Sequence, residues 1–177
     1  MATLKVVQCD ITKLQVDAIV NAANQTLLGG GGVDGAIHHA AGTGLFAECA
    51  TLDGCATGDA KITKGYNLPA KHVIHAVGPV WRGGDKDEPN LLRSCYRRCL
   101  EIAREKELTT IAFPCISTGI YHFPKEHAAR IAVETVQEML PSVPSLDVVV
   151  FVCFSRNNFE IYQSLLERDK DNAEPVF

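Results

Sequence analysis

The sequence predicts an α/β fold, in which a largely parallel sheet carries helices on both faces. Segments typical of strands alternate with segments typical of helices through most of the 177 residues. The later strand segments are continuously apolar, as expected for strands buried on both faces. The length and the composition, with 46% hydrophobic and 21% charged residues, fit one globular domain. We expect this domain at residues 1–167, followed by a flexible tail at residues 168–177.

The first half of the chain supplies short strands and two helices. Residues 4–9 and residues 17–20 predict strands, the second because it is rich in β-branched residues. Apolar residues at i,i+4 spacing then predict a helix over residues 33–41, which Gly42 ends. A second helix is expected at residues 45–52.

The rest of the chain continues the alternation. Asn90 is the expected cap of a long helix that follows a charged surface loop at residues 81–89. The remaining elements are strands at residues 60–63 and 72–77, a helix at 91–106, a strand at 110–113, a helix at 124–140, a strand at 147–153 and a helix at 157–167. Ligands bind outside the carboxyl ends of parallel strands. We therefore expect the chemistry in the loops that follow Cys9, Val20, Phe113 and Cys153.

Charge and cysteine content exclude several classes of protein. The net charge of −4 argues against a broad basic face, so we expect neither nucleic acid nor membrane as a partner. The seven cysteines are odd in number, with no signal peptide before them, which favours a reducing cytoplasm over a disulfide framework. Because no ligand cluster with metal-site spacing occurs, we expect no metal.

Four consecutive glycines, Gly29 to Gly32, open the first helix and predict a phosphate-binding loop. A flexible turn is the alternative. No Gly-Lys-Ser/Thr follows, which disfavours an NTPase. The formal GxGxxG match at residues 30–35 does not follow a strand directly, which disfavours a hydride-transfer enzyme.

Three polar residues flank this loop. Asp34 lies in the first helical turn, where a carboxylate can stabilise the helix end or, beside bound phosphates, activate a water. Asn21 and Asn24 follow the second strand, where carboxamides can hold ribose hydroxyls or make turns.

A second loop with hydroxyls and a glycine, Ser117-Thr118-Gly119-Ile120-Tyr121, follows the strand at residues 110–113. Two such loops fit a diphosphate better than a single phosphate. Tyr121 can close over a sugar or pack, Phe154 can stack on a base or join the core, and Asp10 can accept from an exocyclic amine or cap the turn at Thr12. Nucleophilic catalysis by His38, His39 or Cys115 is disfavoured, because no nucleophile elbow is present.

Four segments together resemble the macro domain family, and within it the MacroD-type ADP-ribose hydrolases. They are Asp10-Ile11-Thr12, Asn21-Ala22-Ala23-Asn24, residues 28–42 (LGGGGVDGAIHHAAG) and residues 116–121 (ISTGIY). The resemblance covers residues 4–167 and implies a three-layer α/β/α sandwich around a mixed six-stranded sheet. Cys9 and His122 depart from it, since glycine is common at both positions in the family.

The resemblance also implies a role for each segment. Asp10, Ile11 and Phe154 would hold adenine, Asn21 would lie at the distal ribose, and Asn24, Asp34 and Tyr121 would serve catalysis. The diphosphate would lie on two loops, made of Gly30, Gly31, Gly32 and Val33 and of Ser117, Thr118, Gly119, Ile120 and Tyr121. The implied activity is release of ADP-ribose from mono-ADP-ribosylated acidic residues of proteins and deacetylation of O-acetyl-ADP-ribose, by a monomer that needs no cofactor. The alternative is a non-catalytic reader of ADP-ribose.

Overall fold

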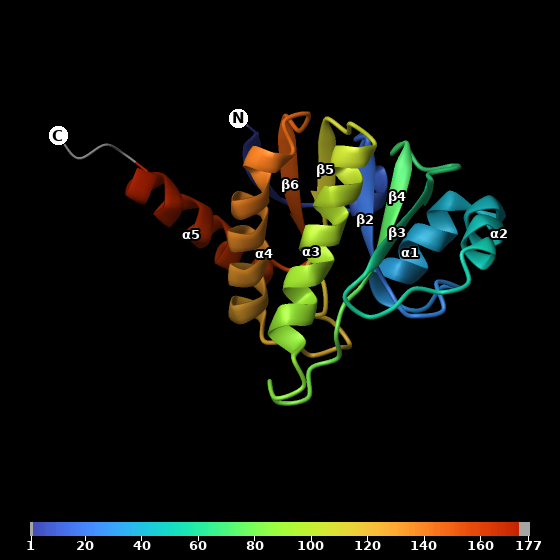
Figure 1. The fold of residues 1–177 in the computed structure, drawn as a ribbon, viewed down its shortest axis with the longest axis horizontal. Helices are drawn as coiled ribbons and strands as arrows, with labels where there is room; N and C mark the ends of the chain where they lie inside the picture. The colour runs from blue at the N-terminus through green and yellow to red at the C-terminus, as the bar shows by residue number, and fades with distance from the viewer. Residues whose placement is uncertain (1, 174–177) are drawn as a thin grey trace.

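The computed structural model describes residues 2–173, which form a single sheet between two layers of helices (Figure 1). The six strands are β1 (Thr3–Gln8), β2 (Ala18–Ala23), β3 (Ala60–Lys64), β4 (His72–Val77), β5 (Thr110–Phe113) and β6 (Val148–Cys153). Their order across the sheet is β1-β6-β5-β2-β4-β3. Every neighbouring pair is parallel except β3 and β4. The mixed, largely parallel six-stranded sheet is therefore confirmed.

The apolar strands fill a core on each face of the sheet, because successive side chains of a strand point to opposite faces. On β2, Ala18 and Val20 pack into one core, and Ile19 packs into the other. On β4, Ile74 and Val73 divide in the same way. This burial on both faces explains why β2 and β4 lack the polar alternation of half-exposed strands.

The helices are divided between the two faces as the alternation predicts. The helices α1 (Gly32–Ala41) and α2 (Thr43–Thr51) pack against one core. The helices α3 (Glu88–Glu105), α4 (Lys125–Met139) and α5 (Arg156–Ala173) cover the other. Short 3₁₀ turns, η1 and η2, occupy Ile11–Lys13 and Leu140–Ser142. The three-layer arrangement is thus confirmed.

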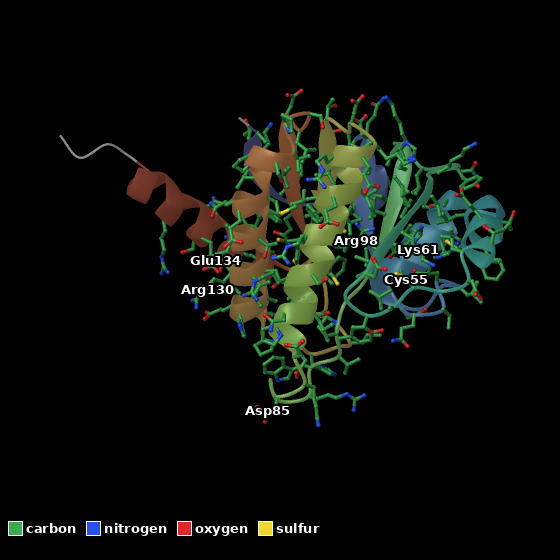
Figure 2. The ribbon with its side chains drawn as sticks, in the orientation of Figure 1. Cys55, Lys61, Asp85, Arg98, Arg130 and Glu134 are labelled. Carbon is green, nitrogen blue, oxygen red and sulfur yellow. The ribbon has the colours of Figure 1, made fainter. Side chains whose placement is uncertain are left out.

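Side-chain contacts tie the edge of the sheet to the helices. Arg98 of α3 points toward the β3 edge (Figure 2), where its Nε donates to Asp59 Oδ1 at 3.0 Å. The same guanidinium donates through Nη1 to Glu101 Oε2 at 2.5 Å, one turn further along α3. The contact with Asp59 links α3 to the residue before β3, the antiparallel strand that ends the sheet.

Two helix ends differ from the prediction by more than two residues. The prediction that Asn90 caps this helix is wrong, because α3 begins at Glu88, directly after Asp87. Pro89 lies in the first turn, where a missing N–H costs nothing. Asn90 instead donates through Nδ2 to Asp87 Oδ1 at 2.8 Å. The last helix continues beyond Glu167 to Ala173, into the segment expected as a tail, and positions 174–177 lie outside the described residues.

Candidate functional site

The loops that follow β1, β2, β5 and β6 meet at one edge of the sheet, because these four strands run parallel. Residues Asp10, Asn24, Pro114 and Phe154 come directly or almost directly after the ends of these strands. This is the edge where α/β sheets bind their ligands. The structure therefore brings to one place the four loops in which chemistry was expected.

The glycine loop lies against the first turns of α1. Gly29 and Gly32 have φ values of +97° and +59°, which are strained for residues with a side chain. A Cβ on Gly35 would lie 2.5 Å from the carbonyl oxygen of Gly30, so the loop packs directly on the helix backbone. Gly31 precedes α1, and no side chain caps the helix there. The first amide groups of α1 therefore lack a side-chain partner, as an anion site requires.

Asn24 and Asp34 converge on Gly30. A Cβ on Gly30 would lie 3.1 Å from Asp34 Oδ2 and 3.3 Å from Asn24 Nδ2. Asn24 also donates to the Gly29 carbonyl at 3.0 Å, while its Oδ1 accepts from Thr26 N at 3.2 Å and from Thr26 Oγ1 at 2.7 Å. The turn chemistry considered for Asn24 is thus present, and it fixes the amide beside the glycine loop.

Asp34 is a buried carboxylate, with 4% of its surface exposed. Its Oδ1 accepts from Asn21 Nδ2 at 2.8 Å rather than from the amides of its own helix. Nε2 of His38 lies 3.4 Å from the same oxygen, one turn along α1. The carboxylate is therefore oriented by a neighbouring strand, which a helix-capping role does not require.

Asn21 lies behind Asp34 and is fully buried on β2. Its Nδ2 donates to Asp34 and contacts His75 Nδ1 at 3.1 Å, while its Oδ1 has no hydrogen-bond partner. His75 is not among the predicted site residues, although a histidine within the apolar segment at residues 72–77 was a signal visible in the sequence. Burial, with a smaller contribution from nearby His38, lowers the pKa of His75 to about 3, which keeps its imidazole neutral.

The second loop is shaped by unusual backbone conformations. Ser117 and His122 have φ values of +66° and +58°, and the Phe123 amide donates to the Ser117 carbonyl at 2.9 Å. Glycine adopts the left-handed backbone conformation found at His122 without steric cost. A Cβ on Gly78 would lie 2.1 Å from Ser117 Oγ, which is buried and has no partner. The Ser117 hydroxyl is therefore buried against Gly78 without a hydrogen-bond partner.

The positions within this loop differ in exposure. Tyr121 is half-buried, and its carbonyl accepts from the Trp81 amide at 2.8 Å. Thr118 is half-buried and donates through Oγ1 to the Cys115 carbonyl at 2.9 Å. Ile120 is 76% exposed beside the exposed Gly119, so an apolar side chain stands free at the tip of the loop.

The expected adenine end is open to solvent. Phe154 is 95% exposed, so the alternative that it joins the core is wrong. Asp10 is exposed, and its Oδ1 accepts from Thr12 Oγ1 at 2.7 Å and from the Thr12 amide at 3.0 Å. These bonds, the side-chain bond first, lower the pKa of Asp10. The capping role of Asp10 is therefore present, and Ile11 beside it is buried.

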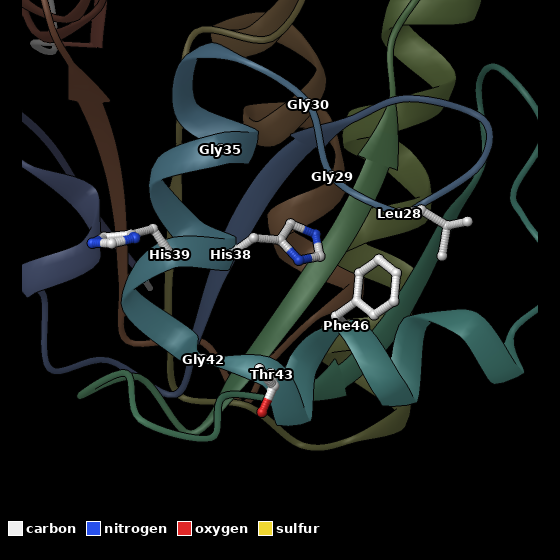
Figure 3. A pocket seen from close by; sticks show the side chains of 9 residues that line it. All are labelled: Leu28, Gly29, Gly30, Gly35, His38, His39, Gly42, Thr43 and Phe46. Atoms are coloured by element: carbon white, nitrogen blue, oxygen red, sulfur yellow. The ribbon is translucent and has the colours of Figure 1, made fainter.

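A pocket of about 430 Å³ lies between the glycine loop, α1 and α2. In Figure 3, the His38 ring points toward Phe46 and Leu28, whereas His39 leaves the opposite side of α1. His38 thus lines this pocket and also contacts Asp34. The His38 imidazole therefore lies between this pocket and the buried carboxylate of Asp34.

Three further properties concern the part of the chain that the structure describes. All seven cysteines lie within it and are free thiols. Over residues 2–173, no group of three or more His, Cys, Asp or Glu side chains is arranged to hold a metal ion. None of the described helices is long and apolar enough to cross a membrane.

Comparisons with known proteins agree with this architecture. A family model described as the macro domain matches residues 20–132. The chain is 52% identical over 167 residues to an O-acetyl-ADP-ribose deacetylase of Enterobacter sp. (strain 638), covering 92% of this chain and 93% of that protein. It is 56% identical over 159 residues to ADP-ribose glycohydrolase MACROD2 of Xenopus laevis, covering 89% of this chain and 38% of that longer protein.

The fold is also similar to that of solved macrodomain structures. The solved structure of a mutant Oceanobacillus iheyensis macrodomain with ADPR has a TM-score of 0.91 and 42% identity to this chain, and the match covers 96% of this chain and 95% of that one. The glycine loop and Asp34 both lie within the residues that the family model matches. The chain therefore belongs to the macro domain family.

Proposed function

We propose that this protein is a MacroD-type hydrolase that removes ADP-ribose from mono-ADP-ribosylated acidic residues of proteins and deacetylates O-acetyl-ADP-ribose. The observation that carries the proposal is the placement of Asp34, a buried carboxylate at the start of α1, between the Asn21 amide and the Gly30 backbone. A module that only binds ADP-ribose needs the loops but not this carboxylate. The names of the two relatives above support a hydrolase.

The two loops would hold the diphosphate through hydroxyl and backbone groups. Gly31 precedes α1, and Gly32 and Val33 begin the helix, whose first amides attract anions. The second loop would add backbone amides and the hydroxyl of the half-buried Thr118. Asp10 would accept from the adenine amine, with Phe154 free to stack on the base. These contacts would set the distal ribose at Asn24 and Asp34.

The reaction we propose is attack of a water on the anomeric carbon of the distal ribose. Asp34, alone or with a substrate phosphate, would orient the water and accept its proton. As the new C–O bond forms, the bond from the anomeric carbon to the ester oxygen breaks and the carboxylate leaves with the electron pair. The products are ADP-ribose and a free carboxylate of the protein, or acetate. Asn24 would hold a ribose hydroxyl, and Tyr121 with Gly32 would shape the pocket around the water.

A paired assay tests this proposal against a reader function. An acidic protein carrying one ester-linked ADP-ribose is incubated with excess enzyme, and released ADP-ribose is followed in a single turnover. The same preparation is titrated with ADP-ribose. We expect both hydrolysis and binding, whereas binding without hydrolysis would assign the reader function. An arginine-linked substrate is the matched control, because its N-glycosidic bond has a poorer leaving group and should persist.

We infer further that the protein acts as a monomer in the cytoplasm, on small-molecule and protein substrates rather than on nucleic acid. The seven free thiols suit a reducing compartment. The net charge of −4 disfavours a polyanionic partner. Light scattering would test the monomer, since a mass near twice 19.2 kDa would contradict it.

A further inference from the structure

The side chain of His75 contacts the Asn21 amide, which in turn donates to the Asp34 carboxylate. His75 is fully buried on β4 and pairs in register with Asn21 of the parallel strand β2. Strand neighbours in register present their side chains to the same face. The imidazole therefore stands beside the Asn21 amide, in the layer between the sheet and α1.

The hydrogen bonds around His75 have a definite direction. Nε2 lies 3.0 Å from Thr63 Oγ1, which itself contacts the Lys64 carbonyl at 3.1 Å. The carbonyl can only accept, so the Thr63 hydroxyl donates to it and accepts from Nε2–H of His75. Nδ1 is then unprotonated, and it accepts from Asn21 Nδ2. Cys49 Sγ, at 3.6 Å from Nε2, is a weaker neighbour.

The orientation of the Asn21 amide follows from its two hydrogen-bond partners. Nδ2 carries two hydrogens, and its two partners are His75 Nδ1 and Asp34 Oδ1. An inverted amide would place Oδ1 against the carboxylate of Asp34 and against the lone pair on Nδ1. The chain from Lys64 through Thr63, His75 and Asn21 therefore ends in a single N–H group directed at Asp34.

We infer that His75 is a positioning residue of this site: by accepting at Nδ1 it locks the Asn21 amide, which in turn holds Asp34 Oδ1 and leaves Oδ2 free toward Gly30. The inference rests on the proposed hydrolase function. The burial that holds the pKa of His75 near 3 also keeps the imidazole a neutral acceptor. No proton of the reaction passes through it.

Two substitutions at position 75 separate positioning from packing. In His75→Asn, the side-chain oxygen can occupy the place of Nδ1 and still accept from Asn21, although a cavity remains. In His75→Gln, the volume is closer to histidine, but the amide reaches toward Thr63 and leaves the place of Nδ1 empty. A role in packing alone predicts that the glutamine variant is the better enzyme. A positioning role predicts the reverse.

The readouts are single-turnover hydrolysis of the ester-linked substrate and calorimetric titration with ADP-ribose and with ADP. We expect His75→Gln to lose roughly 10- to 100-fold in rate, as when a supporting partner of a site residue is removed. We expect His75→Asn to be faster than His75→Gln by at least about 10-fold. ADP lacks the distal ribose, so its affinity should stay at the wild-type value in both variants.

A second, nearly isosteric pair covers the case in which the histidine variants fail to fold. Thr63→Val removes the hydroxyl that accepts from His75 Nε2–H, whereas Thr63→Ser retains a hydroxyl. Thr135→Val is the matched control, because Thr135 is equally buried on α4 across the sheet and its Oγ1 has no partner. We expect a lower rate of hydrolysis in Thr63→Val than in Thr63→Ser, and the wild-type rate in Thr135→Val.

The outcomes distinguish the two proposals. If the wild-type protein binds ADP-ribose without hydrolysing the ester, the proposed function fails. If the wild type is active but the glutamine variant equals or exceeds the asparagine variant, the inference about His75 fails alone. Equal rates for Thr63→Val and wild type would also overturn it. A uniform fall in ADP and ADP-ribose affinity would assign His75 to the stability of the fold and not to the position of Asp34.

Discussion

The sharpest prediction concerns two substitutions of Asp34 that differ in one hydrogen bond. Asp34→Asn keeps an oxygen that can accept from Asn21 Nδ2, which lies 2.8 Å from Asp34 Oδ1 in the wild type, but it removes the base. Asp34→Ala removes both the base and the acceptor. In the alanine variant, one of the two N–H groups of Asn21 Nδ2 is therefore buried without an acceptor, and space opens beside Gly30.

The two variants should lose different amounts of the free energy of unfolding. A buried donor left unpaired costs about 1–3 kcal/mol, so Asp34→Ala should lower the free energy of unfolding by that amount. Asp34→Asn should lower it by less, about 0.5–1.5 kcal/mol, because only the charge on an existing hydrogen bond is lost. Both variants should lose ~10²-fold or more in turnover, the usual contribution of a general base. Both should bind ADP-ribose as well as the wild type or better, since a negative charge near the diphosphate is gone.

The assays are denaturant unfolding, single-turnover hydrolysis and calorimetric titration with ADP-ribose, each on the wild type and both variants. Wild-type turnover in Asp34→Asn would refute the assignment and leave a substrate phosphate or His122 as the base. The double variant with Asn24→Ala adds a further check. If Asp34 and Asn24 share one geometry around the water and the ribose, the double variant should be little slower than the slower single variant.

Three other perturbations test separate parts of the molecule. Gly35→Ala places a Cβ 2.5 Å from the Gly30 carbonyl oxygen, and the resulting overpacking should cost about 1–3 kcal/mol of stability and weaken ADP-ribose binding; unchanged unfolding and affinity would mean that the loop is not held on α1. Asp10→Ala should weaken ADP-ribose binding by about 1–3 kcal/mol with little change in kcat, and a collapsed kcat at normal affinity would contradict the adenine assignment. Burial raises the pKa of Glu88, but the amides of residues 82, 84 and 86 donate to its carboxylate and together lower that pKa to about 2. Its stabilising contribution is therefore complete above an ordinary pKa of 4.5 and is lost as the pH falls toward 2, so Glu88→Gln should be less stable at pH 7 and show a flatter acid dependence in thermal unfolding.

Local patterns were sufficient for the architecture. The alternation of strands and helices, together with the unbroken apolar runs of the late strands, predicted the parallel sheet and its two helical layers. Gly42 ends α1 as predicted, with a φ of +87° that few other residues adopt. These features depend on the residue itself and its near neighbours, so the linear sequence contains them.

Features that depend on how a loop folds, or on where a strand ends in the sheet, were missed. The start of α3 moved from Asn90 to the position after Asp87, because loop amides gather around the carboxylate of Glu88. Propensity at Asn90 alone does not contain that contact. Phe154 had equal reason to join the core or to stay exposed, and only its place at the end of β6 left it 95% exposed.

The sequence by itself determined the residues that can do chemistry in this protein, since the glycine run, Asp34 and Asn24 are recognisable within a span of about ten residues. The tertiary structure decided how they are held. Asn21 and His75 lie 54 residues apart and meet only because β2 pairs with β4 in register. Strand register is a property of the whole sheet, and it places the buried amide and imidazole that orient Asp34.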